Sequence, residues 1–285
     1  MPTLYVVATP IGNLGDMSPR AIQTLQSVAL IAAEDTRVTQ KLLSAFAIHT
    51  PLTSYHAHNE RNKAESLISR MVAESMDMAL TTDAGTPCIS DPGAILVAEA
   101  QRQGVEVIAV AGPCAMAAAL SISGFPVTEW GFVGFLPRNK KELGEKLLDI
   151  AVRMPVAIAH ESPHRIITFL EVLSATLPNT NVSVSCDLTK KHELTLRGSV
   201  AEVLTALQNN PKANKGEYCV VLCFASEDIP KPKATTTSSL PAQLVEEMLQ
   251  GASLREAMGT LVARGERKNA VYTASLQLKE VFQCN

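Results

Sequence analysis

The sequence predicts an α/β protein in which two α/β domains are followed by a small helical tail. Short apolar runs alternate with longer amphipathic runs, a pattern typical of βα units and a largely parallel sheet. Three loops that combine glycine with proline follow three of those apolar runs within the first 115 residues. The 285 residues are enough for two domains. An apolar share of 46% is ordinary for a globular protein with buried cores.

The first predicted domain covers residues 1–124. Its apolar runs predict strands at 4–8, 28–33, 78–82 and 105–110. Its amphipathic runs predict helices at 19–27, 37–46, 60–74, 92–103 and 113–123. Ser18-Pro19 and Asp91-Pro92 each place an N-cap residue before a proline at the first helical position. Gly104 is expected to end the fourth helix at its C′ position.

The second predicted domain covers residues 125–225 and begins where Gly124-Phe125-Pro126 interrupts the periodicity. Its strands are expected at 132–135, 155–160, 181–186, 193–198 and 217–224. Its helices are expected near 139–151, 163–175 and 200–209. The helix at 163–175 is predicted to start at Ser162-Pro163, by the same N-cap and proline pattern.

The remainder of the chain predicts a linker and a helical tail. Residues 226–242 lack an apolar period and are rich in proline and hydroxyl side chains, which indicates a flexible linker. The tail, 243–285, predicts helices at 243–250, 253–263 and 268–280. Gly265, beside basic residues, leaves two interpretations open. The tail is either a helix-turn-helix that binds nucleic acid or a helical hairpin that packs on the body or on a second subunit.

Charge and cysteine content limit the possible partners. The net charge is −3, divided as −4 over residues 1–128 and +1 over 129–285, so an RNA partner would have to bind local basic clusters.

The six cysteines form no Cys-x-x-Cys pair, which predicts reduced thiols in a cytoplasmic protein without a metal site. No apolar run is long enough to span a bilayer, and the first one predicts a strand rather than a signal peptide. We therefore expect no membrane partner.

The three glycine-proline loops predict one small-molecule site. In open α/β sheets, ligands bind beyond the carboxyl ends of the strands. Glycine lets the backbone approach a ligand closely, and proline fixes the loop. The residues expected to form the walls are Pro10, Gly12, Asp83, Ala84, Gly85, Thr86, Ile89, Gly112 and Pro113. The first loop lacks Gly-x-Gly-x-x-Gly and the chain lacks a Walker motif, which excludes the dinucleotide and P-loop classes.

Ionisable residues at other predicted strand ends are candidates for proton handling and for anion binding. Glu161 ends an apolar strand, where a carboxylate stabilises a helix N-terminus or takes part in chemistry. Lys190 and Lys215 are suited to positioning or deprotonating a hydroxyl, or to neutralising phosphate. A lysine base requires a pKa lowered by burial or by nearby cations such as Lys191. Arg37 is expected either to pair with a neighbouring carboxylate or to face RNA.

Three further motifs complete a pattern that is characteristic of one family: Ala33-Glu34-Asp35-Thr36-Arg37, Glu161-Ser162-Pro163-His164-Arg165 and Leu188-Thr189-Lys190. Together with the loops they resemble the ribosomal RNA small subunit methyltransferase I family, of the tetrapyrrole methylase superfamily. The resemblance implies two class III methyltransferase domains and S-adenosyl-L-methionine as cofactor. It implies as substrate the 2′-hydroxyl of a cytidine in the decoding centre of 16S rRNA, within the 30S subunit. It also implies a homodimer and no metal.

The resemblance assigns expected roles. The wall residues given above are expected to bind the cofactor, Lys190, Glu161 and Lys215 to be catalytic, and Arg37, Arg165 and Lys191 to bind substrate. The chain departs from the family pattern on its substrate half, where Cys186-Asp187 replaces an arginine-glutamate pair and Ala159-His160 replaces an aromatic pair. Two alternatives therefore remain: a tetrapyrrole (precorrin-type) methyltransferase, and a non-catalytic RNA-binding ribosome-assembly factor.

Overall fold

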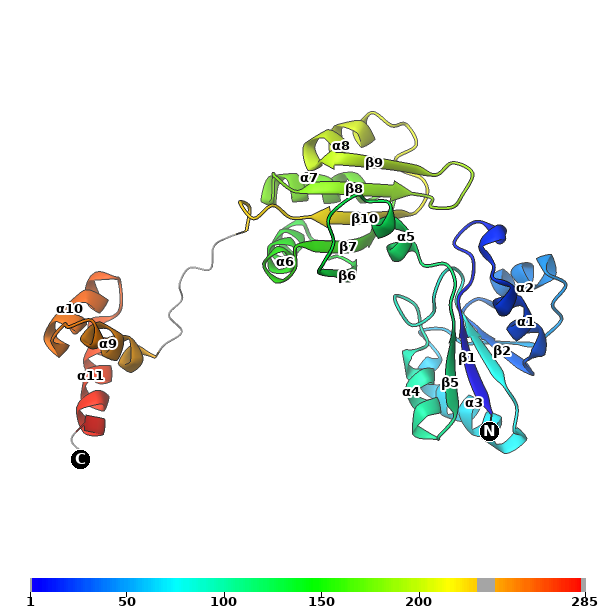
Figure 1. Cartoon of the computed structure of the whole chain (residues 1–285), viewed down its shortest axis with the longest axis horizontal. Coiled ribbons are helices and arrows are strands. Elements are labelled where there is room, and N and C mark those ends of the chain that lie inside the picture. The colour runs from blue at the N-terminus through cyan, green and yellow to red at the C-terminus, as the bar shows by residue number, and fades with distance from the viewer. Residues whose placement is uncertain (1, 230–238, 283–285) are drawn as a thin grey trace. The chain divides into compact units, whose positions relative to one another are not determined.

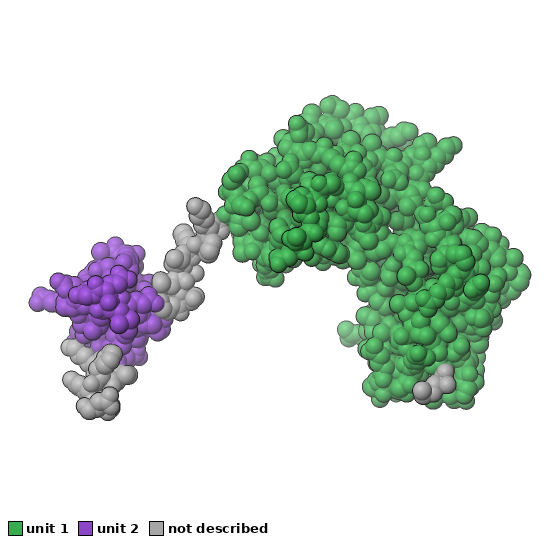
Figure 2. All heavy atoms as spheres, in the orientation of Figure 1, with its two compact units in different colours: residues 1–229 green, residues 230–285 purple. Residues whose placement is uncertain are grey.

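The computed structural model describes residues 2–229 and 239–282. The chain divides into two compact units, residues 1–229 and 230–285 (Figures 1 and 2). Unit 1 contains two five-stranded sheets that follow one another along the chain, and unit 2 contains three helices. The division of unit 1 at residue 124 stays a prediction.

The first sheet is entirely parallel, as its apolar runs predict. Its strands lie in the order β3-β2-β4-β1-β5, and β1 pairs with both β4 and β5. The carboxyl ends of these three strands therefore meet at one edge. The strand β3 is missing from the sequence prediction because it is short and only half-buried. The bounds are β1 Thr3–Val7, β2 Leu30–Ala33, β3 Leu52–Ser54, β4 Met78–Thr81 and β5 Glu106–Val110.

The helices around the first sheet confirm one of the two predicted proline starts there. The Ser18 hydroxyl accepts a hydrogen bond from the Ala21 amide at 3.1 Å, which caps α1. The prediction at Asp91-Pro92 is wrong, since α4 begins two residues later with Gly93 as its N-cap residue. Gly93 has φ +139°, and a Cβ there would lie 2.6 Å from Leu80, so this turn requires glycine. The bounds are α1 Pro19–Ser27, α2 Thr36–Ala45, α3 Glu60–Glu74 and α4 Ala94–Arg102.

The second sheet is mixed rather than largely parallel. Its order is β6-β7-β10-β8-β9, and within it β6 pairs with β7 in parallel while the other neighbours are antiparallel. The connection between β8 and β9 is too short for a crossover, and a short connection requires antiparallel neighbours. The bounds are β6 Trp130–Phe135, β7 Val156–Glu161, β8 Asn181–Cys186, β9 Leu194–Ser199 and β10 Tyr218–Cys223.

Helices cover the second sheet, and α5 packs against its strands β7, β8 and β10. The helix predicted to start at Ser162-Pro163 begins instead at Ile166, because residues 163–165 form a turn. In this turn the Ser162 amide donates to the Glu161 carboxylate at 2.7 Å. The bounds are α5 Ala115–Ser121, α6 Lys140–Arg153, α7 Ile166–Thr176 and α8 Val200–Gln208.

Unit 2 has its own apolar core, formed by buried side chains of all three of its helices. Both ends of the segment predicted as linker, 226–242, are ordered. At its end the helix α9 begins at Leu240. At its start Asp228 accepts two hydrogen bonds of 2.7 Å from Asn179. Residues 230–238 of the predicted linker lie outside the described residues. The bounds are α9 Leu240–Leu249, α10 Leu254–Ala263 and α11 Lys268–Phe282.

Because the core of unit 2 is small, one truncation is expected to unfold it. Leu261 is fully buried, and Leu261→Ala in such a site costs about 2–5 kcal/mol. Hydrogen–deuterium exchange should show lost protection in α9, α10 and α11, with protection of unit 1 retained. The adjacent, exposed Val262 is the control, since Val262→Ala should leave both units protected. Retained protection of unit 2 in Leu261→Ala would contradict the proposed core.

Candidate functional site

The three glycine-proline loops lie together at the carboxyl edge of the first sheet. The loop after β1 is tied to the loop after β4 by two backbone hydrogen bonds, Thr9 N to Gly85 O at 2.8 Å and Gly85 N to Thr9 O at 3.0 Å. The loop after β4 is tied to the loop after β5, because the Thr86 hydroxyl donates to the Pro113 carbonyl at 3.1 Å. Gly112 in that third loop lies close to Ala8 of the first loop, since a Cβ on Gly112 would be only 3.0 Å from the Cβ of Ala8. The three loops therefore form one continuous wall.

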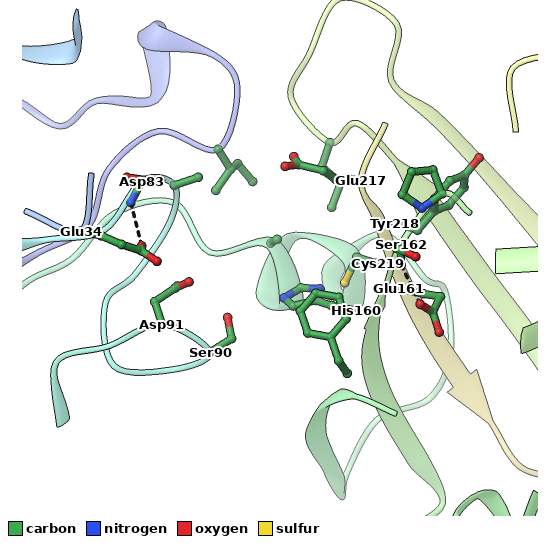
Figure 3. Close-up of a pocket in the computed structure, with 16 residues that line it drawn as sticks. Glu34, Asp83, Ser90, Asp91, His160, Glu161, Ser162, Glu217, Tyr218 and Cys219 are labelled. Carbon is green, nitrogen blue, oxygen red and sulfur yellow. Dashed lines mark hydrogen bonds between the residues drawn. The ribbon is translucent and has the colours of Figure 1, made fainter. Parts of the chain in front are cut away.

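A pocket of about 470 Å³ opens between this wall and the ends of strands β6, β7 and β10 (Figure 3). Such a volume is typical of small-molecule sites. The first half of the chain contributes Ile11, Glu34, Asp83, Ala84, Ser90, Asp91 and Ala115. The second half contributes Phe135, His160, Glu161, Ser162, Pro163, Leu188, Glu217, Tyr218 and Cys219.

The predicted wall residues divide between this pocket and its surroundings. Asp83 and Ala84 line the pocket. Pro10 and Gly12 line a smaller hollow of about 290 Å³, which Asp83 also borders. The remaining predicted residues belong to the same loops but are not in the lining of either cavity: Gly85, Thr86, Ile89, Gly112 and Pro113.

One side of the pocket is acidic. The Glu34 carboxylate accepts from the Thr82 hydroxyl at 2.5 Å and from the Asp83 amide at 3.3 Å. Desolvation, and next the charge of Glu34, raise the pKa of Asp83. The same two causes raise the pKa of Asp91 to about 6. These carboxylates destabilise one another when the pocket is empty, and a cationic ligand would relieve that repulsion.

On the opposite side, Glu161 and Arg165 form a pair that braces the loop after β6. The Glu161 side chain is 1% exposed, and its Oε2 lies 3.3 Å from Arg165 Nη2. That oxygen has no hydrogen-bond partner among the described residues. Arg165 Nη2 also donates to the carbonyls of Leu136 at 3.2 Å and Pro137 at 2.8 Å. The guanidinium expected to face substrate is thus engaged with protein groups.

Lys190 is held by two carboxylates. Its Nζ lies 2.8 Å from both Asp187 Oδ1 and Glu217 Oε2. Desolvation lowers its pKa, but the hydrogen bonds to the two carboxylates outweigh that effect and raise it. The ammonium therefore stays protonated, which argues against a basic role and for a positioning role. Two of its three N–H donors serve the carboxylates.

The Lys190 side chain also packs against the loop after β1. A Cβ on Gly12 would lie 2.4 Å from Lys190 Cγ, and Gly12 has φ +144°. Glycine is therefore required twice at this position, for its backbone conformation and for the close approach. This contact joins a loop of the first sheet to the turn that follows β8.

The other predicted cationic residues lie on the surface. The Arg37 side chain is 86% exposed and pairs with Asp35 at 2.6 Å, which corresponds to the ion-pair interpretation. Lys191 and Lys215 are exposed, and neither is in the lining of the two cavities.

The sequence analysis missed several lining residues. Asp91 was interpreted as a helix cap, and His160, Glu217 and Cys219 carried no local signal because they come together through strands β7 and β10. His160 packs edge-on against Phe132, with ring centroids 5.0 Å apart. Desolvation lowers the pKa of His160, so its ring is neutral near pH 7.

The residues present fit a cationic, partly apolar cofactor such as S-adenosylmethionine. The acidic side suits its sulfonium and ammonium charges, while Ile11, Ala84, Ala115 and Leu188 supply apolar surface. Among the described residues, no group of three or more His, Cys, Asp or Glu side chains is arranged to hold a metal ion. Within the same residues, no helix has both the length and the apolarity needed to cross a membrane.

Comparison with known proteins shows the family to which the chain is similar. A family model described as Tetrapyrrole (Corrin/Porphyrin) Methylases matches residues 3–204. A curated protein of Halalkalibacterium halodurans, named Ribosomal RNA small subunit methyltransferase I, is 40% identical over 95% of this chain and 93% of its own length. Proteins of the same name from Synechocystis sp. and Escherichia coli O157:H7 are 39% and 37% identical, over 98% and 96% of this chain and 99% and 94% of their own lengths.

Solved structures share the fold at low identity. Uroporphyrin-III C-methyl transferase from Thermus thermophilus, complexed with S-adenyl homocysteine, is 16% identical with a TM-score of 0.52 over 78% of this chain and 97% of that one. A diphthine synthase is 12% identical with a TM-score of 0.58, over 80% of this chain and 93% of its own. At these identities the likeness concerns the fold alone.

The contact between Gly12 and Lys190 predicts an unusually costly substitution. Gly12→Ala is expected to lower the free energy of unfolding by about 2–4 kcal/mol, because backbone strain and steric overlap add together. Gly104→Ala is the matched control, since Gly104 also has positive φ but has open space around its missing Cβ. It should cost about 1 kcal/mol. Equal losses for the two variants in urea unfolding would contradict the close approach.

The raised pKa of Asp91 predicts a pH dependence. Between the unfolded value of 3.8 and the folded value of about 6, the folded state binds more protons, so this carboxyl makes stability fall as pH rises. For a fully buried carboxyl this shift would lower the free energy of unfolding by about 3 kcal/mol between low and neutral pH. Because Asp91 is only half-buried, solvent screening reduces the expected loss to about 1 kcal/mol. Asp91→Asn should therefore stabilise the protein at pH 7 but not at pH 4, measured by urea unfolding. The exposed Asp16→Asn is the control, and an equal effect of Asp91→Asn at both pH values would contradict the assignment.

Proposed function

This chain belongs to the tetrapyrrole methylase family and, within it, to the ribosomal RNA small subunit methyltransferase I family, and we propose that it methylates the ribose 2′-oxygen of a cytidine in 16S rRNA. It is an S-adenosylmethionine-dependent methyltransferase. The observation that carries the proposal is the pocket of about 470 Å³, which has an acidic side for a cationic donor and faces a second side of proton-handling groups.

The donor side is the wall of three loops. S-adenosylmethionine supplies an electrophilic methyl group on a sulfonium centre. We assign its binding to the loops after β1, β4 and β5, with Glu34, Asp83 and Asp91 balancing its positive charges. Gly85 and Gly112 let the loops approach one another closely, since a Cβ there would lie 3.3 Å from Ile11 and 3.0 Å from Ala8. Hydrogen bonds between these loops hold the wall in place before the donor binds, which reduces the ordering that binding requires.

The acceptor side handles the ribose hydroxyl. We assign to Glu161 the acceptance of the hydroxyl proton as the oxygen attacks, because its Oε2 lacks a hydrogen-bond partner in the described part of the chain and has only the ion pair with Arg165 at 3.3 Å. The protonated Lys190 would use its third N–H to stabilise the developing negative charge on that oxygen or an adjacent phosphate. Arg165 keeps Glu161 oriented and is therefore a positioning residue. Lys215, Lys191 and Arg37 remain predicted contacts of a longer RNA segment.

The wider assembly is also part of this proposal. We infer that the substrate is the 30S subunit, that the enzyme acts in the cytoplasm, and that it is a homodimer, as the family resemblance implies. Light scattering of the purified protein tests the dimer, and comparison of free 16S rRNA with 30S subunits tests the substrate form.

The relatives favour an RNA substrate over a tetrapyrrole. Eight curated proteins that are 37–43% identical to this chain, among them the three described above, are named Ribosomal RNA small subunit methyltransferase I. The uroporphyrin enzyme shares 16% identity, which concerns the fold alone. A non-catalytic assembly factor would not need the acidic donor side, yet Glu34, Asp83 and Asp91 are all present in the pocket.

The decisive experiment is transfer of labelled methyl to 30S subunits from a strain that lacks the endogenous enzyme, followed by nuclease mapping of the label. Label on the ribose of one decoding-centre cytidine would support the proposal. Label on a base, or none despite donor binding, would refute the assigned reaction. Uroporphyrinogen as acceptor tests the tetrapyrrole alternative in the same assay.

The geometry of Lys190 predicts how its removal acts. Lys190→Ala should slow methyl transfer by about 100-fold or more, because it removes the cation that stabilises the acceptor oxygen. The affinity for S-adenosylhomocysteine, measured by calorimetry, should change by less than about threefold in Lys190→Met, which removes the ammonium but keeps the stem that packs on the loop after β1. Arg70→Ala removes another ion-paired cation, on α3, and should leave the rate unchanged. An undiminished rate of methyl transfer in Lys190→Ala would show that another group stabilises the acceptor oxygen.

A further inference from the structure

A large apolar side chain is exposed at the rim of the pocket. Phe135, the last residue of the edge strand β6, is 64% exposed and lines the pocket. Its ring centroid lies 5.9 Å from that of His160, and Phe132 contacts the same imidazole from β6. The three rings form a neutral aromatic cluster whose outermost member, Phe135, is largely open to solvent.

The loop that presents this ring is held in place from below. The carbonyls of Leu136 and Pro137, directly after Phe135, accept hydrogen bonds from Arg165, and Arg165 is paired with the buried Glu161. A ring held on such a support loses little freedom when a flat partner stacks on it. The support explains why an apolar side chain stays exposed at this point rather than folding into the core.

Basic side chains continue directly from the ring. Arg138, Lys140 and Lys141 are exposed in the loop and at the start of α6. Arg138 has no ion pair within the part of the chain that the structure describes. Lys140 and Lys141 have long contacts, at 3.8 Å to Glu171 and 4.0 Å to Glu145. An aromatic ring beside exposed cations is the combination that binds single-stranded RNA.

The opposite side of the pocket does not suit RNA. Glu34, Asp83 and Asp91 line it, as Figure 3 shows, and their charges repel phosphates. On the side of Phe135 the carboxylates Glu161 and Glu217 are paired with Arg165 and Lys190. Charge therefore favours approach of the polynucleotide along β6 and the start of α6, with the donor on the acidic side.

We propose that Phe135, backed by His160, is the stacking surface for a nucleobase of the substrate RNA, and that Arg138 binds a phosphate next to it. This inference rests on the proposed function and names the RNA contacts of that same site. Stacking on Phe135 requires an unpaired base, so the enzyme selects a nucleotide in a single-stranded stretch. Phosphate binding at Arg138 orients the strand, and the aromatic face holds the nucleoside at the pocket.

Phe135→Ala is the first test. Base–aromatic stacking supports an expected loss of about 10- to 100-fold in kcat/KM for 30S subunits, with unchanged affinity for S-adenosylhomocysteine. Phe135→Trp should keep kcat/KM within about threefold of the wild-type value. The control is Val152→Ala, an exposed apolar residue on α6 that lines neither cavity. Arg138→Ala should raise KM and reduce its salt dependence.

A second measurement does not depend on methyl transfer. Trp130 is the single tryptophan of the chain, so Trp130→Phe combined with Phe135→Trp places one fluorophore at the stacking surface. A short cytidine-containing oligoribonucleotide should quench it, and the same oligonucleotide with an abasic residue in place of the cytidine should quench it less.

The outcomes separate the two proposals. Unchanged kcat/KM in Phe135→Ala, or equal quenching by both oligonucleotides, would overturn the stacking assignment while leaving the methyltransferase proposal intact. Loss of donor affinity in Phe135→Ala would also overturn it, since the ring would then contact the donor. If the wild-type enzyme methylates no RNA, the proposed function fails, and base-dependent quenching would still support the stacking surface.

Discussion

The arrangement of the site depends on the close approach of Gly12 to the stem of Lys190. One residue belongs to the loop after the first strand and the other to the turn after β8, and there is no room for a Cβ between them. Asp187 and Glu217 hold the ammonium in place, so the lysine keeps its charge while its stem packs on the loop. The two sheets thereby contribute to one pocket, which is lined by residues of both halves of the chain.

The two sides of that pocket differ in how their carboxylates are balanced, because Glu161 and Glu217 pair with Arg165 and Lys190, whereas Glu34, Asp83 and Asp91 have no ion pair among the described residues. A sulfonium donor is stabilised by carboxylates, and Glu34 lies beside Asp83 and Asp91, whose pKa values are raised by desolvation and next by the charge of Glu34. A polynucleotide requires the opposite sign, and the exposed cations follow Phe135 in the loop before α6. A net charge of −3 is therefore compatible with RNA as substrate, because the proposed recognition uses one local patch rather than the field of the whole protein.

Predictions from proline and glycine succeeded where the signal was purely local. Ser18 caps α1 as expected, whereas Asp91 and Ser162 precede proline but do not cap a helix. At Asp91 the following Gly93 bends the chain before α4 begins, and at Ser162 the neighbouring Glu161 carboxylate takes the amide. Both exceptions occur in the pocket lining, where tertiary contacts outweigh capping preferences.

The sequence by itself determined the parallel first sheet, its three loops and two of the carboxylates that line the pocket, Asp83 and Glu161, since hydrophobic periodicity and glycine-proline chemistry act over a few residues. Only the tertiary structure decided that Arg165 points back to its own loop, that Lys190 remains protonated, and that Phe135 stays exposed. Those outcomes depend on which side chains the pairing of β7 with β10 and the packing of the loops bring together. Such contacts join residues far apart in the chain, and no local pattern encodes them.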